Sequence, residues 1–288
     1  MTSQIKTVML LALLSGLVIV LGGMLGGRTG IIIAFGLALV MNVGSYWYSD
    51  SIVLRMYNAR EVAPEDAPML HNMVAELAQK AGIPKPRVCV MPDETPNAFA
   101  TGRDPEHGVV AVTDGIMRIL SPEELKGVLA HEIGHIANRD ILIQTVASVM
   151  GSAIVSIANM MQWAAIFGIG RSDDEEGGGV SPFVGILMAI VAPIAAALIQ
   201  FAISRSREYL ADDAGAQLAG NPLYLAGALQ KLESWNQNRP MQNVNAATAS
   251  MFIVSPLSNL SGGNFTALFS THPPIEERIA RLQAMAGR

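Results

Sequence analysis

The chain has 288 residues, of which 51% are hydrophobic and only 15% are charged. Its mean hydropathy of +0.37 is too high for an ordinary soluble protein of this length, so we expect a membrane protein with one soluble part. The formal net charge of −5 argues against nucleic acid as a main partner. A single cysteine, Cys89, excludes an intramolecular disulfide and a multi-cysteine metal site, so metal ligands must be histidines and carboxylates.

Two apolar stretches, residues 7–25 and 31–47, begin the chain, and each is close to the ~20 residues that cross a bilayer. The first could instead be a cleaved signal peptide, but no small-residue cleavage site precedes a mature domain and a second apolar stretch follows at once. The aromatic residues 46–48 are typical of a membrane surface. We therefore expect residues 1–50 to form two transmembrane helices.

Residues 51–140 have the composition of a soluble domain. Their pattern predicts a helix over residues 67–81 and short strands at residues 87–91 and 108–113, which would form a small sheet. Cys89, inside the first strand, is most simply a core residue.

The motif that carries chemistry is H-E-I-G-H at residues 131–135. Two imidazoles four residues apart lie on one face of a helix, so His131 and His135 can bind a single zinc ion. Zinc lowers the pKa of a bound water toward ~7, and Glu132 is placed to take a proton from that water. This pattern is typical of peptide-bond hydrolysis.

The surrounding sequence places this motif on a helix. Ser121, Pro122 and Glu124 form a capping box with proline at the first helical position. Apolar residues recur at helical spacing from Leu125 to Ile136 and would form the buried stripe. The same motif could instead contain two ordinary core histidines, but the helix cap and the apolar helix face favour a metal site.

Two more apolar stretches, residues 141–169 and 183–203, are joined by an acidic, glycine-rich turn at residues 171–179. We expect residues 141–204 to form a transmembrane hairpin. Lysines and arginines gather on one side of the four expected spans, which predicts that both termini and the metal motif face the cytosol. That side carries Lys6, Arg55, Arg60, Arg139, Arg205 and Arg207, and the other side carries Arg28 and Arg171.

The last part of the chain, residues 205–288, supplies a candidate third ligand. A catalytic zinc needs three protein ligands and one open position, and Glu208 directly follows the expected hairpin. Asp212, four residues later, is placed to orient a ligand histidine through its other ring nitrogen. A glutamate flanked by arginines could also be an ordinary salt-bridged surface residue.

Four motifs together resemble the HtpX heat-shock proteases, which are zinc metallopeptidases of the bacterial inner membrane. These are H-E-I-G-H, the segment at residues 204–212, N-A-F-A-T-G at residues 97–102, and T-H-P-P at residues 271–274, in the family's order over essentially the full length. The resemblance implies one Zn2+ held by His131, His135 and Glu208, with Glu132 as general base. It also implies a cytosolic active site, self-cleavage, and degradation of misfolded membrane proteins under stress.

Three further predictions concern substrate handling. Metalloproteases generally hold substrate as an added strand, and the small, alternating residues Asn97, Ala98, Phe99 and Ala100 suit that role, although an ordinary edge strand would look the same. His272, held by two following prolines, could donate a hydrogen bond to the reacting carbonyl oxygen, or it could instead cap the final helix. The stretch at residues 236–264 could be a flap over the cleft or only a loop.

The sequence thus predicts an α+β fold: a mainly helical, gluzincin-like zinc endopeptidase domain with a small β-sheet, carried on four transmembrane helices. Its expected partners are membrane-protein substrates and the lipid bilayer. One alternative is a prenyl-protein-type protease, which normally needs more spans. Another is a membrane scaffold with a structural zinc, which would need a fourth protein ligand.

Overall fold

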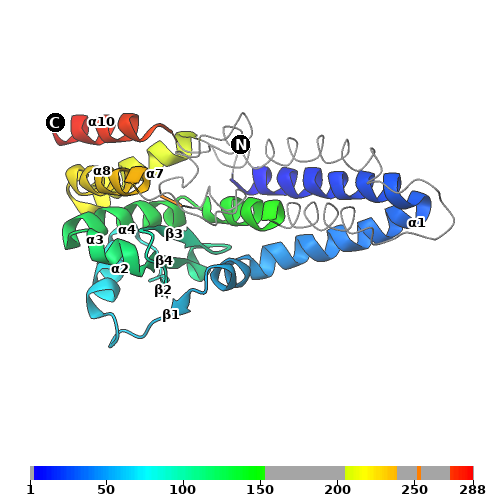
Figure 1. Ribbon diagram of the computed structural model, residues 1–288, viewed down its shortest axis with the longest axis horizontal. Helices are drawn as coiled ribbons and strands as arrows, with labels where there is room; N and C mark the ends of the chain where they lie inside the picture. Colours follow the sequence, from blue (N-terminus) through cyan, green and yellow to red (C-terminus); the bar gives the residue numbers. More distant parts are fainter. Residues whose placement is uncertain (1–2, 153–204, 239–251, 254–272, 288) are drawn as a thin grey trace.

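The computed structural model describes residues 3–152, 205–238, 252–253 and 273–287. The molecule is elongated, with a long helical hairpin at one end and a mixed helical and β part at the other (Figure 1). The hairpin is α1, Ser3–Met56, which is interrupted at Gly26 and Gly27. Gly27 has φ 55° and ψ −137°, a conformation that glycine adopts without strain, and the chain reverses direction there.

The two halves of α1 pack side by side (Figure 1). Val18, Ala34 and Ala38 form a small apolar cluster between them, and Asn42 Nδ2 donates a hydrogen bond of 2.8 Å to Ser15 Oγ. The outer surface of the second half is strongly apolar. Its side chains at positions 32, 33 and 40 are 72%, 66% and 69% exposed, which suits a lipid environment rather than water.

One described helix segment, Gly26–Met56, is long and apolar enough to cross a membrane. Two shorter apolar helices, Thr7–Gly23 and Ile141–Ser152, coincide with the first and third predicted spans. The rest of the third predicted span and all of the fourth lie outside the described residues. The structure therefore supports a membrane-spanning helix, whereas the predicted number of four remains a prediction.

The small sheet has the order β1-β2-β4-β3. Its strands are β1 Arg60–Glu61, β2 Arg87–Met91, β3 Ala98–Thr101 and β4 Val109–Thr113. The central pair, β2 and β4, is parallel, and the two outer pairs are antiparallel, so β3 forms an edge. This confirms the two strands predicted from the sequence to within one residue.

Helices cover the sheet and meet around α4, Pro122–Ala137. The others are α2 Pro68–Ala81, α3 Asp114–Ile119, α7 Arg205–Ala219, α8 Pro222–Asn238 and α10 Ile275–Ala286, with the 3-10 helix η1 at Pro105–His107. The predicted capping box is present: Ser121 N–H donates to Glu124 Oε2 (2.7 Å), and Glu124 N–H donates to Ser121 Oγ (3.3 Å). The helix is buried from Gly127 to Ile136, so the motif lies inside the core.

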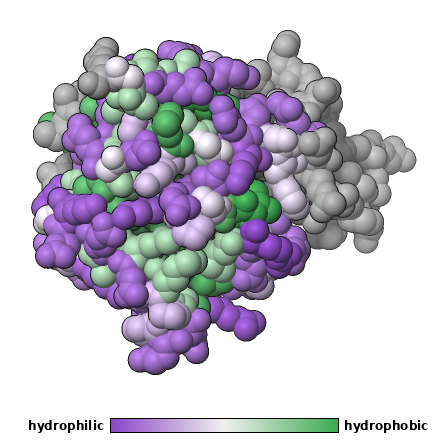
Figure 2. Space-filling view, turned by 90° about the vertical axis from the view of Figure 1, so that its left-hand side faces the viewer, coloured by the Kyte–Doolittle hydropathy of each residue, from purple (hydrophilic) through white to green (hydrophobic). Residues whose placement is uncertain are grey.

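The end of the molecule remote from the α1 hairpin has an ordinary mixed surface. Figure 2 shows hydrophilic side chains interspersed with small apolar patches on that face, in contrast to the apolar exterior of α1.

Cys89 is buried in an apolar cluster that also contains Phe99 and Phe252, as the sequence predicts for a core residue. His71 has a structural role, because its Nε2 lies 3.0 Å from the Val62 carbonyl and its Nδ1 2.9 Å from Lys85 Nζ.

Candidate metal and catalytic site

Two helices from distant parts of the sequence form the centre of the site. α4 packs directly against α7, and the approach is close because glycines lie at the crossing. A Cβ added to Gly215 of α7 would lie 2.9 Å from the backbone nitrogen of His131. A Cβ on Gly134 of α4 would lie 3.3 Å from the Ala211 carbonyl oxygen. This close packing places the acidic face of α7 against the histidine face of α4.

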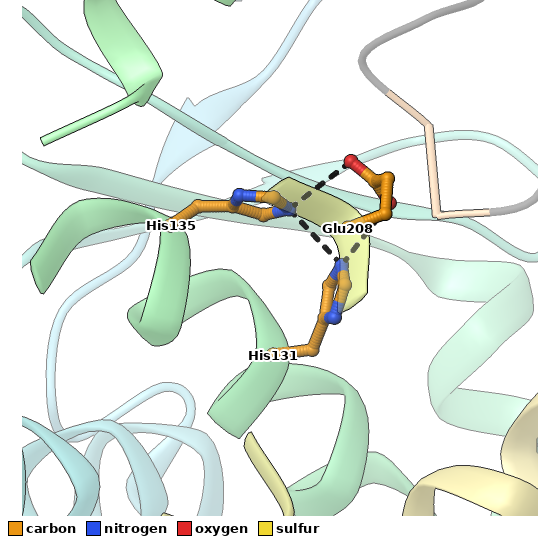
Figure 3. Close-up of side chains that lie close together, drawn as sticks. All are labelled: His131, His135 and Glu208. Carbon is orange, nitrogen blue, oxygen red and sulfur yellow. Dashed lines mark hydrogen bonds and ion pairs between the residues drawn. The ribbon is translucent and has the colours of Figure 1, made fainter. Parts of the chain in front are cut away.

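The three predicted ligands converge on one point (Figure 3). The Nε2 atoms of His131 and His135 are 3.1 Å apart. Glu208 Oε1 lies 3.5 Å from His135 Nε2, and Glu208 Oε2 lies 3.8 Å from His131 Nε2. All three side chains are buried, with exposed fractions of 1%, 6% and 1% in the order His131, His135 and Glu208.

The other nitrogen of each histidine ring faces a carboxylate. His131 Nδ1 lies 3.0 Å from Asp212 Oδ1, and His135 Nδ1 lies 3.2 and 3.3 Å from the two oxygens of Asp140. A ring nitrogen beside a carboxylate carries a proton, so Nε2 is the atom of each ring that is left to bind a metal ion in place of a proton. Asp212, which the sequence analysis predicts to orient a ligand histidine, thus lies beside His131.

This donor set fits a zinc ion. Two lone pairs and a carboxylate that face one buried point repel one another unless a cation lies between them. At zinc–nitrogen distances of ~2.0–2.1 Å, tetrahedral ligands are ~3.3 Å apart, which agrees with the observed separations. The ligand atoms of His131, His135 and Glu208 all lie within 4.8 Å of one another.

The electrostatics of the site also favour a cation. Burial would lower the pKa of His135, but the charges of Asp140, Glu208 and Glu132 outweigh it and raise that pKa to about 10. Burial dominates at His131 and lowers its pKa. The excess of negative charge around the two rings is what a divalent cation would neutralise.

Glu132, the predicted general base, is buried and has a raised pKa. Its side chain is only 3% exposed, and burial, with a further contribution from the charge of Glu208, raises its pKa to about 8. A hydrogen bond from the backbone of Ala100 acts in the opposite direction and ties the carboxylate to β3. A carboxyl with a pKa near the working pH can both accept and release a proton.

The structure brings the predicted substrate strand to this site. Residues 97–100 are buried beside α4, and they lie on and just before the edge strand β3. Asn97 Oδ1 accepts a hydrogen bond of 2.9 Å from the N–H of Ala98. Phe99 faces away from the metal cluster, because its ring packs against Tyr57 and Phe252 at centroid distances of 5.6 and 6.5 Å.

Arg278 of α10 is a site residue that the sequence analysis missed. Its side chain has 0% exposure, and it donates two hydrogen bonds to Asp212, of 2.7 and 2.9 Å, and one of 3.0 Å to the Ile253 carbonyl. Burial alone would raise the pKa of Asp212, but Arg278 and His131 outweigh it and lower that pKa to about 2. The only sequence signal for Arg278 was its helical spacing, because it is four residues before the buried Leu282 and so lies on the inner face of α10.

Asp140 was also missed as a site residue, since the sequence shows it only as the last acidic residue before an apolar stretch. Two other predictions fall outside what the structure describes. His272 lies outside the described residues, and of the stretch at 236–264 only residues 236–238, at the end of α8, and 252–253 are described.

A carboxylate set between two helix-borne histidines, with a glutamate from a later helix, defines a zinc metallopeptidase. The comparison of sequences agrees, since residues 64–286 match peptidase family M48. The chain belongs to this family, and it is a membrane zinc metalloprotease.

Full-length relatives place the chain more closely. It is 54% identical to a Protease HtpX homolog of Syntrophobacter fumaroxidans, over 99% of this chain and 100% of that protein. It is 55% identical to a homolog of the same name in Pyrococcus furiosus, over 98% and 96% respectively. A distant structural likeness, with a TM-score of 0.47 and 18% identity, is to the crystal structure of S. mikatae Ste24p, over 85% of this chain and 56% of that chain.

Proposed function

We propose that the chain is an endopeptidase that cleaves misfolded or damaged membrane proteins, and itself, with zinc held by His131, His135 and Glu208 and with Glu132 as general base. The observation that carries this proposal is the convergence of two Nε2 lone pairs and a carboxylate at one buried point. A structural zinc would need a fourth protein ligand, and the cluster among the described residues has three.

Each residue has a distinct part in the mechanism. His131, His135 and Glu208 would hold the zinc, which would supply Lewis acidity toward the substrate carbonyl and the attacking water. Glu132, whose pKa is already raised by burial, takes the proton of that water and returns it to the leaving nitrogen. The hydrogen bond from the Ala100 backbone keeps the carboxylate oriented during both transfers.

We propose that β3 binds the substrate backbone. The N–H of Thr113 bonds to the carbonyl of Asn97, so alternate residues of β3 pair with β4 while Ala98 and Ala100 direct their backbone groups away from it. Both outward N–H groups already have acceptors within the chain, from Asn97 and Glu132. The carbonyl oxygens of Ala98 and Ala100 can therefore accept hydrogen bonds from an extended substrate, largely independent of its sequence.

A direct experiment compares cleavage and zinc content of the purified, lipid-supplemented protein. Glu132→Gln should retain zinc and lose cleavage of an unfolded membrane-protein substrate, by ~10²–10⁴-fold or more. His135→Ala and Glu208→Ala should lose both. Glu94→Gln is the matched control, because Glu94 pairs with Arg118 at an exposed site, and it should change neither. Full cleavage by a zinc-free preparation would contradict the proposal.

Membrane placement is also a proposal. We infer four transmembrane helices in a bacterial inner membrane, with residues 1–50 and 141–204 in the bilayer and residues 51–140 and 205–288 in the cytosol. The uneven distribution of lysine and arginine supports this orientation. A reporter fused after Arg288 should be active only in the cytosol, and one inserted at residues 173–179 only on the far side. The reverse pattern would overturn the orientation.

His272 is proposed as the donor to the reacting carbonyl oxygen. It precedes Arg278 by six residues, and the Arg278 guanidinium lies 3.8 Å from Glu208. His272→Ala should reduce turnover ~10²-fold or more, with zinc content and melting temperature unchanged. Lost thermal stability with turnover per folded molecule preserved would instead assign His272 to the start of the final helix.

A further inference from the structure

Asp140 lies in the short connection between α4 and the apolar helix Ile141–Ser152. Arg139 has φ 57°, a left-handed conformation that is uncommon for a residue other than glycine. Through this turn, the N–H of Asp140 reaches back to the His135 carbonyl (3.3 Å), while its own carbonyl accepts from the N–H of Gln144 (3.4 Å). Asp140 is therefore both the residue that closes α4 and the residue that starts the next helix.

The Asp140 side chain faces His135. Both carboxylate oxygens lie within 3.3 Å of His135 Nδ1, and the residue is only 2% exposed. The negative charge of Asp140 also acts on Arg207, the buried residue that precedes Glu208. A buried carboxylate in this position fixes which nitrogen of the ring carries the proton and where the other nitrogen points.

The helix that begins at Asp140 contacts the other half of the site as well. Thr145 Oγ1 lies 3.0 Å from Thr101 Oγ1 at the end of β3, and it donates to the Ile141 carbonyl (2.7 Å). Val149 packs against the cluster around Phe99. The described apolar helix Ile141–Ser152 thus contacts the strand beside the metal cluster, and Asp140 at its start contacts a histidine of that cluster.

We propose that Asp140 is a positioning residue that holds His135 with its Nε2 toward the metal, and that it makes zinc retention depend on the placement of the apolar helix Ile141–Ser152. This inference rests on the proposed function, in which His135 is a zinc ligand. The two histidines are then held from different sides, His131 by Asp212 and Arg278 from the C-terminal part and His135 by Asp140 from the base of the apolar helix.

The test measures zinc affinity of the full-length protein by competition with a chromogenic chelator. Asp140→Ala should weaken zinc binding ~10–100-fold, the usual effect of losing a carboxylate that orients a ligand histidine. Asp140→Asn retains an oxygen that can accept from His135 Nδ1, so its loss should be smaller. Asp104→Asn is the matched control: Asp104 Oδ1 lies 2.6 Å from Nδ1 of the exposed His107, and this variant should bind zinc like the unsubstituted protein.

Thermal unfolding of the zinc-free variants separates positioning from folding. The proposal is supported if Asp140→Asn unfolds within a few degrees of the unsubstituted protein and still binds zinc more weakly. It is overturned if both Asp140 variants keep full zinc affinity, or if they lose only thermal stability. His135→Ala is measured in parallel: zinc loss there with none in the Asp140 variants overturns this inference alone, whereas full zinc affinity in His135→Ala overturns the proposed function too.

Discussion

Two clusters of histidine and carboxylate side chains in the described part of the chain have the residue types of a metal site. One is His131, His135 and Glu208, and the other is Asp104, Glu106 and His107 in and beside η1. In each cluster the possible ligand atoms lie within 4.8 Å of one another. The two clusters differ in burial, in solvation and in the charged groups around them.

The cluster at η1 is open to water and internally satisfied. The side chains of His107 and Asp104 are 48% and 29% exposed, and Asp104 Oδ1 accepts from both the N–H and the ring of His107. The guanidinium of Arg103 faces His107 Nε2, so a positive charge stands where a cation would bind. Solvation and internal hydrogen bonds leave little reason for a metal to bind there.

The cluster on α4 and α7 is buried, and side chains around it hold its ligands in place. Each histidine is held by a carboxylate at Nδ1, and Arg278 in turn holds one of those carboxylates. Burial leaves the inward-facing atoms little solvation, and the Arg278 guanidinium lies 3.8 Å from Glu208. The comparison teaches that burial, and neighbouring side chains that hold the ligands in place, distinguish a metal site from a surface cluster more than residue type does.

The largest expected effect tests Arg278, which holds one of the carboxylates beside the ligand histidines. Arg278→Met removes the buried guanidinium that pairs with Asp212 and lies near Glu208, which should cost ~3–5 kcal/mol of unfolding free energy. Arg103→Met, at the exposed cluster, should cost less than ~1 kcal/mol. Thermal or denaturant unfolding in detergent measures both. Equal losses in the two variants would contradict the role given to Arg278.

The next effect distinguishes the two clusters by metal linkage. Zinc at about 100 times its dissociation constant should stabilise the folded protein by ~2.7 kcal/mol, which a shift in melting temperature reports. Chelation should remove that shift. His135→Ala should abolish it and His107→Ala should preserve it. Loss of the shift in His107→Ala would show that zinc binds at η1 instead.

A smaller effect tests the close approach of α4 and α7. Gly215→Ala would place a Cβ 2.9 Å from the His131 backbone nitrogen, and backbone cannot yield as a flexible side chain can, so we expect a loss of ~1–3 kcal/mol and weaker zinc binding. Gly44→Ala is a control in α1, where an added Cβ has nothing within 4 Å. Unchanged zinc affinity in Gly215→Ala would show that the ligands tolerate separation of the helices.

The smallest effect concerns the start of the helix that carries both histidines. Ser121→Ala removes a cap from α4 and should cost about 1 kcal/mol. Because α4 is buried among α2, α7 and α8, zinc affinity and turnover should stay close to those of the unsubstituted protein. A large loss of zinc would mean that the cap, rather than the packing of α4, sets the ligand geometry.

Local patterns explain most of what could be predicted. The capping box, the strands at 87–91 and 108–113, and the spacing of His131 and His135 each depend on residues near one another in the chain. Such signals are reliable because hydrogen bonding and side-chain direction repeat with a fixed period along a helix or strand. Glu208 and Asp212 could be predicted for the same reason, since their spacing places both on one helix face.

Arg278 and Asp140 could not be predicted in this way, because their roles depend on packing between distant segments. A charged residue in the first turn of a helix is ordinarily solvated, and only the docking of α10 buries Arg278 against Asp212. Likewise, only the left-handed turn at Arg139 returns the Asp140 carboxylate to His135.

The sequence by itself determined the apolar helices, the small sheet, the zinc-binding helix and the membership of peptidase family M48. Tertiary structure alone decided that Asp140 and Arg278 belong to the site, and that the cluster at residues 131, 135 and 208 is buried while the one at η1 is exposed. The physical reason is that residue chemistry and local period are written along the chain. Burial and the field of neighbouring charges exist only once α4, α7 and α10 have packed together.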